Sequence, residues 1–233
     1  MSPSVSAVTQ SQLSVSVDGN PTPDDAKVDA FELAASRRAL KFIKNRIGPE
    51  GMMALLAPDF REGQGTWDDW LEQSGGELRL IKVEMTVKGL TVGEFEPLIT
   101  GINKEIHFAM HPEHMVPLFD LEGGILRIGE TEGDDFYKLF VMHIGEEGPI
   151  EDELDSSCTY RFAGVMRNAA GDAEACVLHQ FKDTPDGMYA KVSQWVPAAA
   201  PDDVTKRVHE HLAIEFANLF RMAKFDGELS QDA

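Results

Sequence analysis

The sequence predicts an α+β protein in which an antiparallel sheet wraps around a long C-terminal helix, the helix-grip arrangement. Three observations predict this fold. Between residues 125 and 196, successive segments alternate apolar and polar residues, as half-buried strands do. The turns between them, such as 168–172 and 183–187, are rich in Gly, Asp, Asn and Pro. From residue 202 to about 224, apolar residues return with helical spacing.

The elements are expected in the following order. Residues 1–25 lack periodicity and are rich in Ser, Val, Pro and Thr, which predicts a disordered tail. Residues 26–233 form a single domain with an N-terminal helical extension over 26–47, which the sequence GPEG stops. The remaining expected elements are a short helix at 67–73, a strand at 78–87, a helix from a Thr91–Glu94 capping box to about 102, a strand from 106 to Pro112, strands at 125–130, 136–144, 159–168, 174–182 and 188–196, and the terminal helix.

Charge and cysteine content restrict the partners. The 233 residues contain 21 Lys and Arg but 40 Asp and Glu, a net charge of −19, which argues against binding to nucleic acid. No apolar run is long enough to span a membrane, so no membrane partner is expected. Cys158 and Cys176 imply no disulfide framework, and the N-terminus lacks the pattern of a secretory signal, so the expected location is the cytoplasm.

The terminal helix carries a candidate site. Its apolar stripe consists of Val204, Val208, Leu212 and Leu219, and His211 and Glu215 fall inside this stripe. Their i, i+4 spacing places the imidazole and the carboxylate one turn apart on the same face. A buried carboxylate is costly unless it is paired or binds a metal. The pair is therefore either a hydrogen-bonded pair of the core or one half of a metal site.

Other titratable residues could supply the second half. His111 and His114 lie in the sequence HPEH, where the proline should end a strand and expose both side chains at a rim. Glu130 shares strand parity with Leu126 and Ile128, and His179 shares it with Val177 and Phe181, so both should point inward. Each residue alone could equally be an ordinary core or edge residue. Together, histidines and carboxylates without thiolates suit Zn²⁺, with Fe²⁺ or Mn²⁺ as less favoured ions.

Three segments resemble one known family. The runs KVEMTVKGLTVGEFEPLITGINKEIHFAMHPEHM, LHQFKDTPDGMYAKVSQW and HLAIEFANL resemble segments of the diacetylphloroglucinol hydrolase and phloretin hydrolase family, in the same order. The resemblance extends over residues 75 to 225 approximately. It implies a helix-grip fold of the Bet v 1 or START type and a zinc ion held by His, Glu, His and Glu. It also implies hydrolysis of the carbon–carbon bond between an aromatic ring and an acyl group.

Transferred to this sequence, the resemblance implies that the metal ligands are His111, Glu130, His211 and Glu215, with His179 as the acid/base residue. His114 would contact substrate or replace His111 as ligand. Met110 stands where the family has Trp, and the short spacing from His111 to Glu130 leaves Glu132 as a rival for Glu130. The expected lining of the substrate cavity includes Phe108, Phe136, Phe181 and Trp195.

The expected function is therefore zinc-dependent hydrolysis of a small aromatic acylphenol, and the sequence leaves a homodimer open. The main alternative is a non-catalytic carrier of an apolar or aromatic ligand, in which His211 and Glu215 are a structural pair. A metal enzyme of different chemistry, such as a cyclase or an Fe²⁺ oxygenase, is a third alternative. Metal analysis of the protein would separate the carrier from the enzymes.

Overall fold

The computed structural model describes residues 16–17, 20–21, 26–131, 137–146, 148 and 151–231. The chain divides into two compact units, residues 1–42 and 43–233, and each is described by itself. In the first unit, strand β1 (Ser16–Val17) pairs antiparallel with strand β2 (Asn20–Pro21). The rest of the predicted tail lies outside the described residues.

Helix α1 (Ala26–Gln73) begins in the first unit and is interrupted at Gly48, whose φ of 73° and ψ of 166° are not helical. Glycine adopts a positive φ without the penalty that a side chain brings. Pro49 follows, and proline is favoured at the first position of a helix. The sequence GPEG thus ends one helix as expected, but a second helix begins directly after it. The short helix predicted at 67–73 is the last part of this longer one.

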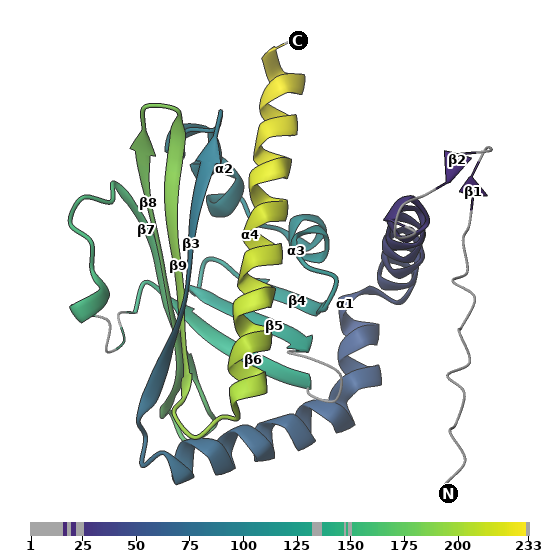
Figure 1. Ribbon diagram of the computed structural model, residues 1–233. Helices are drawn as coiled ribbons and strands as arrows, with labels where there is room; N and C mark the ends of the chain where they lie inside the picture. The colour runs from purple at the N-terminus through teal and green to yellow at the C-terminus, as the bar shows by residue number, and fades with distance from the viewer. Residues whose placement is uncertain are drawn as a thin grey trace, which may run out of the picture. The chain divides into compact units, whose positions relative to one another are not determined.

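The second unit contains a seven-stranded antiparallel sheet with the order β3-β9-β8-β7-β6-β5-β4 among the described residues (Figure 1). Neighbouring strands from β4 to β9 follow one another along the chain, and β3 closes the order by pairing with β9. The strands are β3 (Leu78–Lys88), β4 (His114–Asp120), β5 (Ile125–Thr131), β6 (Tyr137–Ile144), β7 (Tyr160–Arg167), β8 (Ala173–Thr184) and β9 (Gly187–Pro197).

The region between β3 and β5 differs most from the sequence prediction. Helix α2 (Val92–Thr100) has the predicted capping box, with both Thr91–Glu94 hydrogen bonds present. The strand predicted from residue 106 is wrong, because helix α3 (Lys104–Met110) occupies this segment. The Asn103 side chain accepts hydrogen bonds from two backbone N–H groups of its first turn, at 3.0 Å each. Strand β4 was not predicted and begins only after Pro112, at His114.

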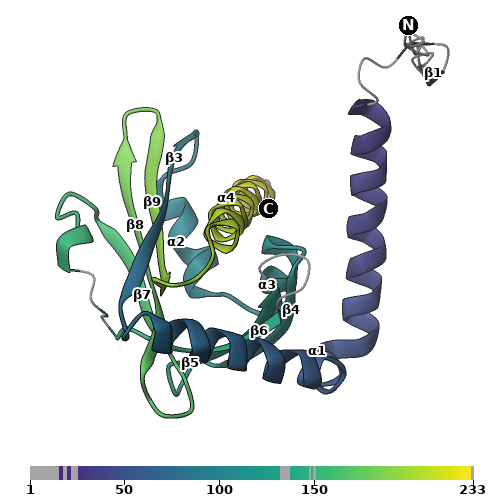
Figure 2. The same cartoon turned by 60° about the horizontal axis from the view of Figure 1, so that its bottom comes forward.

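Helix α4 (Asp202–Gln231) lies along the inner face of the curved sheet, as Figures 1 and 2 show from two directions. The predicted apolar stripe of α4 is buried, since each of its members is at most 4% exposed: Val204, Val208, Leu212 and Leu219. These residues belong to a core that also includes side chains of α2, β3, β6, β8 and β9. The predicted α+β helix-grip class is confirmed.

The second half of α1 is fixed to the sheet by a buried polar network. Trp67 is fully buried, its ring meets the edge of Phe140 with 5.3 Å between centroids, and its indole nitrogen donates to the backbone oxygen of Glu174 at 3.0 Å. The side chain of Glu174 forms a buried ion pair with Lys138 at 2.8 Å and accepts from Gln64 at 2.9 Å. Because these groups satisfy one another away from water, they fix the position of α1 against β6 and β8.

Candidate metal centre

Helix α4 brings two of the predicted ligands to the inner side of the sheet. His211 is 5% exposed. Glu215 follows one turn later, with its Oε2 atom 4.0 Å from Nε2 of His211. The helical periodicity that predicted a shared inward face for this pair is therefore confirmed.

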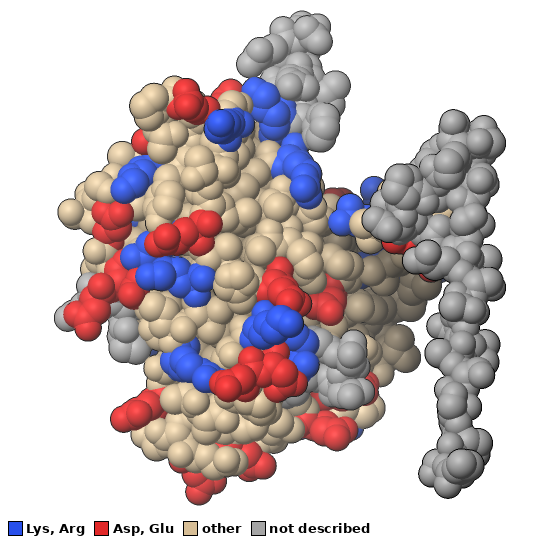
Figure 3. All heavy atoms as spheres, in the orientation of Figure 1, with Lys and Arg blue, Asp and Glu red and all other residues tan. Residues whose placement is uncertain are grey.

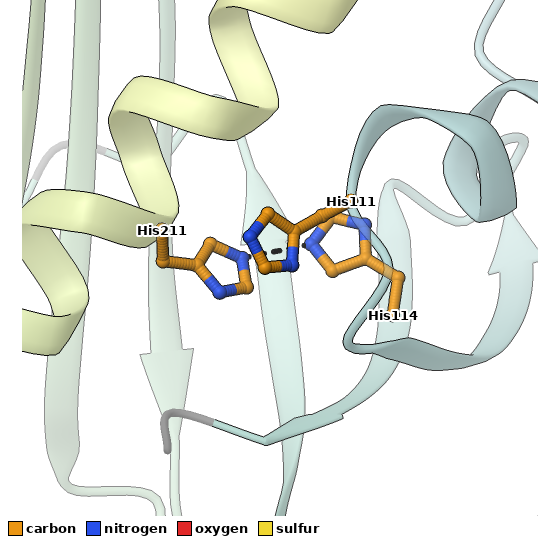
Figure 4. Close-up of side chains that lie close together, drawn as sticks. All are labelled: His111, His114 and His211. Carbon is orange, nitrogen blue, oxygen red and sulfur yellow. Dashed lines mark hydrogen bonds between the residues drawn. The ribbon is translucent and has the colours of Figure 1, made fainter. Parts of the chain in front are cut away.

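The sequence HPEH forms a tight turn between α3 and β4 and not an exposed rim. His111 and His114 are 2% and 1% exposed, so the predicted exposure of these side chains is wrong. The reason is that α3 ends at Met110 and the chain then turns back under α4 to start β4. Figure 4 shows both rings next to His211, and all three offer a ring nitrogen within 4.8 Å of one another.

Strand β5 adds Glu130, which is opposite His114 in the β4–β5 register. Its Oε2 atom lies 3.1 Å from Nε2 of His114 and 3.7 Å from Nε2 of His211. The two Nε2 atoms are 2.9 Å apart. Ligands of a tetrahedral ion at about 2.1 Å would lie roughly 3.4 Å from one another. The three atoms thus have nearly the spacing that zinc ligands require.

Hydrogen bonds to the far side of the rings determine which nitrogen can bind a metal. Nδ1 of His114 donates to the backbone oxygen of His107 at 3.0 Å, so Nε2 carries the lone pair. Nδ1 of His211 makes no hydrogen bond among the described residues, but it lies 3.5 Å from a carboxylate oxygen of Glu113, whose negative charge favours a proton on Nδ1 and again leaves Nε2 free. Two lone pairs would then face each other across 2.9 Å (Figure 4). A cation between them removes this repulsion, so the residues present fit a metal ion.

His111 carries its proton on the opposite ring nitrogen from His114 and His211. Its Nδ1 atom accepts the backbone N–H of Glu113 at 3.1 Å, so the neutral ring carries its proton on Nε2. The His111 ring stacks on His211 with 3.7 Å between centroids and an angle of 20° between the planes. The hydrogen bonding therefore favours His114 as ligand and gives His111 the role of packing against the His211 ring.

Burial controls the charges of this cluster. Burial raises the pKa of Glu215 well above its usual value, and the neighbouring Glu130 carboxylate raises it further. Burial also raises the pKa of Glu130, although His211 opposes this shift. The pKa of His114 is lowered to about 3, chiefly by burial. Two buried carboxyl groups this close together are costly to ionise in a protein interior, and a divalent cation would offset that cost for both.

The cluster forms part of the wall of a cavity of about 70 Å³ between α4 and the sheet. Most of the other lining residues are apolar: Ile99, Ile102, Met110, Leu126, Ile128, Met142, Phe162, Met166, Val177, Leu212, Phe216 and Leu219. A mainly apolar cavity with a few converging polar groups is the usual form of a small-molecule site.

His179 lines the same cavity, as its strand parity predicts, and is 6% exposed. Its ring lies parallel to Phe162, with an interplanar angle of 9°, and meets the edge of Phe216 with 4.7 Å between centroids. Burial lowers its pKa to about 3. The structure therefore brings the predicted residues together: His111, His114 and His211 form one cluster, and Glu130, Glu215 and His179 lie beside it on the cavity wall.

The predicted aromatic lining is placed differently. Trp195 packs with Cys176 and Leu178 on the opposite face of the sheet and does not line the cavity. Phe108 is also absent from the cavity wall, because α3 turns its ring toward Lys44, whose Nζ atom is 5.3 Å from the ring centroid. Phe136 and the rival ligand Glu132 lie outside the described residues.

Three residues near the site were missed by the sequence analysis. His107 lines the cavity from α3, Glu113 faces His211 from the turn, and Lys44 donates from α1 to the backbone oxygen of Pro112 at 2.7 Å. His107 could have been found by treating Asn103 as an N-cap, which places His107 and His111 one turn apart. No sequence pattern connects Lys44 to a turn 68 residues away.

Comparisons with known proteins leave the family open. No family model matches the chain, and no curated protein matches it. Similar solved structures include Ara h 8.0201 (12% identity, 63% of this chain and 98% of that chain, TM-score 0.45) and an uncharacterized protein from Rhizobium leguminosarum (15%, 64% and 95%, 0.43). A Polyketide-cyc-like protein from Corynebacterium glutamicum is also similar (9%, 65% and 95%, 0.38).

In the view of Figure 3, acidic and basic side chains are interspersed over the described residues. None of the described helices is both long and apolar enough to cross a membrane.

Proposed function

We propose that this protein is a zinc-dependent hydrolase that cleaves the carbon–carbon bond between an aromatic ring and an acyl group. The observation that carries the proposal is the convergence of His114, His211, Glu130 and Glu215 on one wall of a mainly apolar cavity. The resemblance of three segments to the phloretin hydrolase family supports the choice of reaction and substrate class.

These four residues would hold the ion. Zinc bound there would supply Lewis-acid activation of a carbonyl oxygen. The chain orients the ligands through the His107 carbonyl behind His114 and the Glu113 carboxylate near His211. Such contacts fix the tautomer and orientation of a ligating histidine. The apolar wall opposite them would exclude water from the ring of the substrate.

His179 would move the proton. Hydrolysis of the ring–acyl bond places a hydroxyl on the acyl carbon and a hydrogen on the ring carbon. The position of His179 on the cavity wall lets its imidazole accept a proton from the substrate, although burial lowers its pKa to about 3 and so opposes protonation. It can then return this proton to the ring carbon that loses the acyl group.

The cavity must enlarge to take such a substrate. Its volume of about 70 Å³ is smaller than the roughly 150 Å³ cavity that holds benzene in another protein. Met110, Met142 and Met166 line it, and methionine side chains are unbranched and adapt readily to a ligand. We therefore expect the methionine side chains to change rotamer when an aromatic ring enters.

Metal analysis and turnover test the proposal together. The protein purified without chelator should contain close to one equivalent of zinc by mass spectrometry and should hydrolyse 2,4,6-trihydroxyacetophenone to phloroglucinol and acetate. Treatment with a chelator should abolish turnover, and added zinc should restore it. A folded protein that neither contains nor takes up a divalent metal would contradict the proposal.

Matched variants test the ligand set. His114→Ala should weaken zinc binding by about 10- to 100-fold or more, whereas His111→Ala should change it by only a few fold, because His111 offers no lone pair to the ion. His209→Ala, on the exposed side of α4, is the control for loss of a histidine. The reverse order of effects would assign His111 as the ligand.

The alternative is a carrier of an apolar ligand. The contact between Nε2 of His114 and Nε2 of His211 is compatible with a hydrogen bond if one ring carries a proton there. A protein that binds aromatic compounds but no metal, and that shows no turnover, would support this alternative.

A further inference from the structure

His107 is a buried histidine whose ring has no hydrogen-bond partner. It is 1% exposed, and neither Nδ1 nor Nε2 finds a partner among the described residues. Leaving a buried polar group without a partner destabilises a protein, and such groups are rare in native structures. A ring with two unpaired nitrogens therefore requires an explanation.

Packing and not hydrogen bonding fixes the orientation of this ring. His107 stacks on His114 with 4.2 Å between centroids and meets Phe119 edge-on at 5.4 Å. The main chain of His107 is hydrogen-bonded, since its N–H donates to the Asn103 oxygen at 2.9 Å and its oxygen accepts from His114 at 3.0 Å, but its ring makes no hydrogen bond among the described residues. The ring is thus held in place while its nitrogens stay available.

His107 also borders the cavity that Glu130, Glu215 and His179 line. Residues from four separate elements, α3, β5, β8 and α4, therefore surround one space. A ligand in this space that carries oxygen substituents would find the proposed metal ligands on one side and an imidazole without partners next to them.

We propose that His107 is a ligand-binding residue that recognises a hydroxyl group on the aromatic ring of the bound molecule. A neutral imidazole has one donor and one acceptor nitrogen, and a phenolic hydroxyl has the matching acceptor and donor. The ligand class is a ring with at least one hydroxyl substituent. This inference rests on the proposed function only in taking the cavity to hold an aromatic molecule.

Such a residue would provide selectivity. A site with a polar group that pairs with a substrate hydroxyl rejects the analogue without that hydroxyl, because the polar group of the protein is then left unpaired. His107 would therefore discriminate between hydroxylated and unsubstituted rings, while the carbonyl oxygen of the substrate would lie at the proposed metal site.

Two probes that differ only in hydroxyl groups test this role. Binding of 3,5-dihydroxytoluene and of toluene to the zinc-loaded full chain is measured by calorimetry, since neither compound has an acyl group to lose. We expect wild type to prefer the dihydroxy compound. In His107→Phe, which keeps a ring for stacking, this preference should fall by roughly tenfold, with little change for toluene.

Two further variants keep the test decisive. His107→Gln, which retains a donor and an acceptor, should recover part of the preference, and exposed His209→Phe should leave it unchanged. An unchanged preference in both folded His107 variants would overturn the inference while zinc-dependent turnover still stands. If wild type binds neither probe, the inference about His107 is overturned as well. If wild type prefers the dihydroxy probe but shows no hydrolysis of the acylphenol, the result counts against the proposed function alone.

Discussion

Burial of His179 makes the stability of the folded protein depend on pH. Its pKa is about 3 in the folded protein and about 6.5 in an unfolded chain, so below pH 6.5 the unfolded chain binds a proton that the folded protein does not. The contribution of His179 is therefore complete above pH 6.5 and decreases as the pH falls toward 3.

The variant His179→Asn should remove this dependence. Between pH 7 and pH 5, the free energy of unfolding of the metal-free wild type should fall by about 2 kcal/mol more than that of the variant, as measured by urea denaturation. The pKa of His114 is also lowered, so His114 too makes the free energy of unfolding fall as the pH falls. Only the difference between wild type and variant isolates the contribution of His179. Parallel curves for the two proteins would show that His179 is accessible to protons in the folded state.

At the scale of single residues, side-chain direction could be predicted wherever the element was assigned correctly. Strand alternation placed Glu130 and His179 on the inner face, and helical spacing placed His211 beside Glu215. The choice between His111 and His114 could not be made, because it depends on which ring nitrogen meets a backbone group. Trp195 was misplaced because β9 is buried on both faces, so burial alone does not identify the side that faces the cavity.

At the scale of elements, the site depends on a contact between α1 and the turn that carries His111, Glu113 and His114. Lys44 is 1% exposed, and its Nζ atom donates to the backbone oxygen of Pro112. Burial lowers its pKa to about 8, with Glu113 opposing the shift. Burial disfavours the charged form of the Lys44 amine, so we infer that Lys44 is retained because its hydrogen bond fixes the conformation of this turn.

Replacement of Lys44 tests this contact. Lys44→Met should lower zinc affinity by about tenfold, as loss of an outer-shell contact does, because the turn that orients His114 and Glu113 would loosen. Isothermal titration with zinc measures the effect, and Lys41→Met, at an exposed position one turn earlier in α1, is the control. Equal zinc affinity in both variants would mean that the turn keeps its conformation without the hydrogen bond from Lys44.

The elements themselves were predictable to different degrees. Most strands of the meander and α4 were found because period-2 and period-3.6 patterns are strong over long segments. The segment 106–110 was misassigned as a strand because a seven-residue helix is too short for its period to differ clearly from alternation, and Asn103 was not recognised as its cap. The second half of α1 was only partly found because Pro58 lies inside it.

At the scale of the whole second unit, the proposed ion joins segments that are distant in the sequence: the turn after α3, strand β5 and helix α4. An ion that binds only the folded state stabilises it by an amount that grows with its free concentration. At about 100 times the dissociation constant, this amounts to roughly 2.7 kcal/mol.

Zinc should therefore raise the thermal unfolding temperature of wild type in a concentration-dependent manner. The same titration should have little effect on Glu215→Gln, because this change removes a ligand charge but keeps the shape of the side chain. Differential scanning calorimetry with zinc and with a chelator measures the effect. An equal increase in both proteins would place the stabilising ion outside the α4 site.

The small cavity has a consequence for the kinetics of ligand entry. Under the proposed function, an aromatic ring would enter this cavity of about 70 Å³ only after the methionine side chains have moved, so the closed form would have to open before it associates with ligand. Opening then limits the observed association rate, which should reach a plateau at high ligand concentration and not rise without limit. The apparent dissociation constant also increases in inverse proportion to the open fraction of molecules. A substitution that merely widens the cavity, such as Met142→Ala, would accelerate binding without adding any new contact.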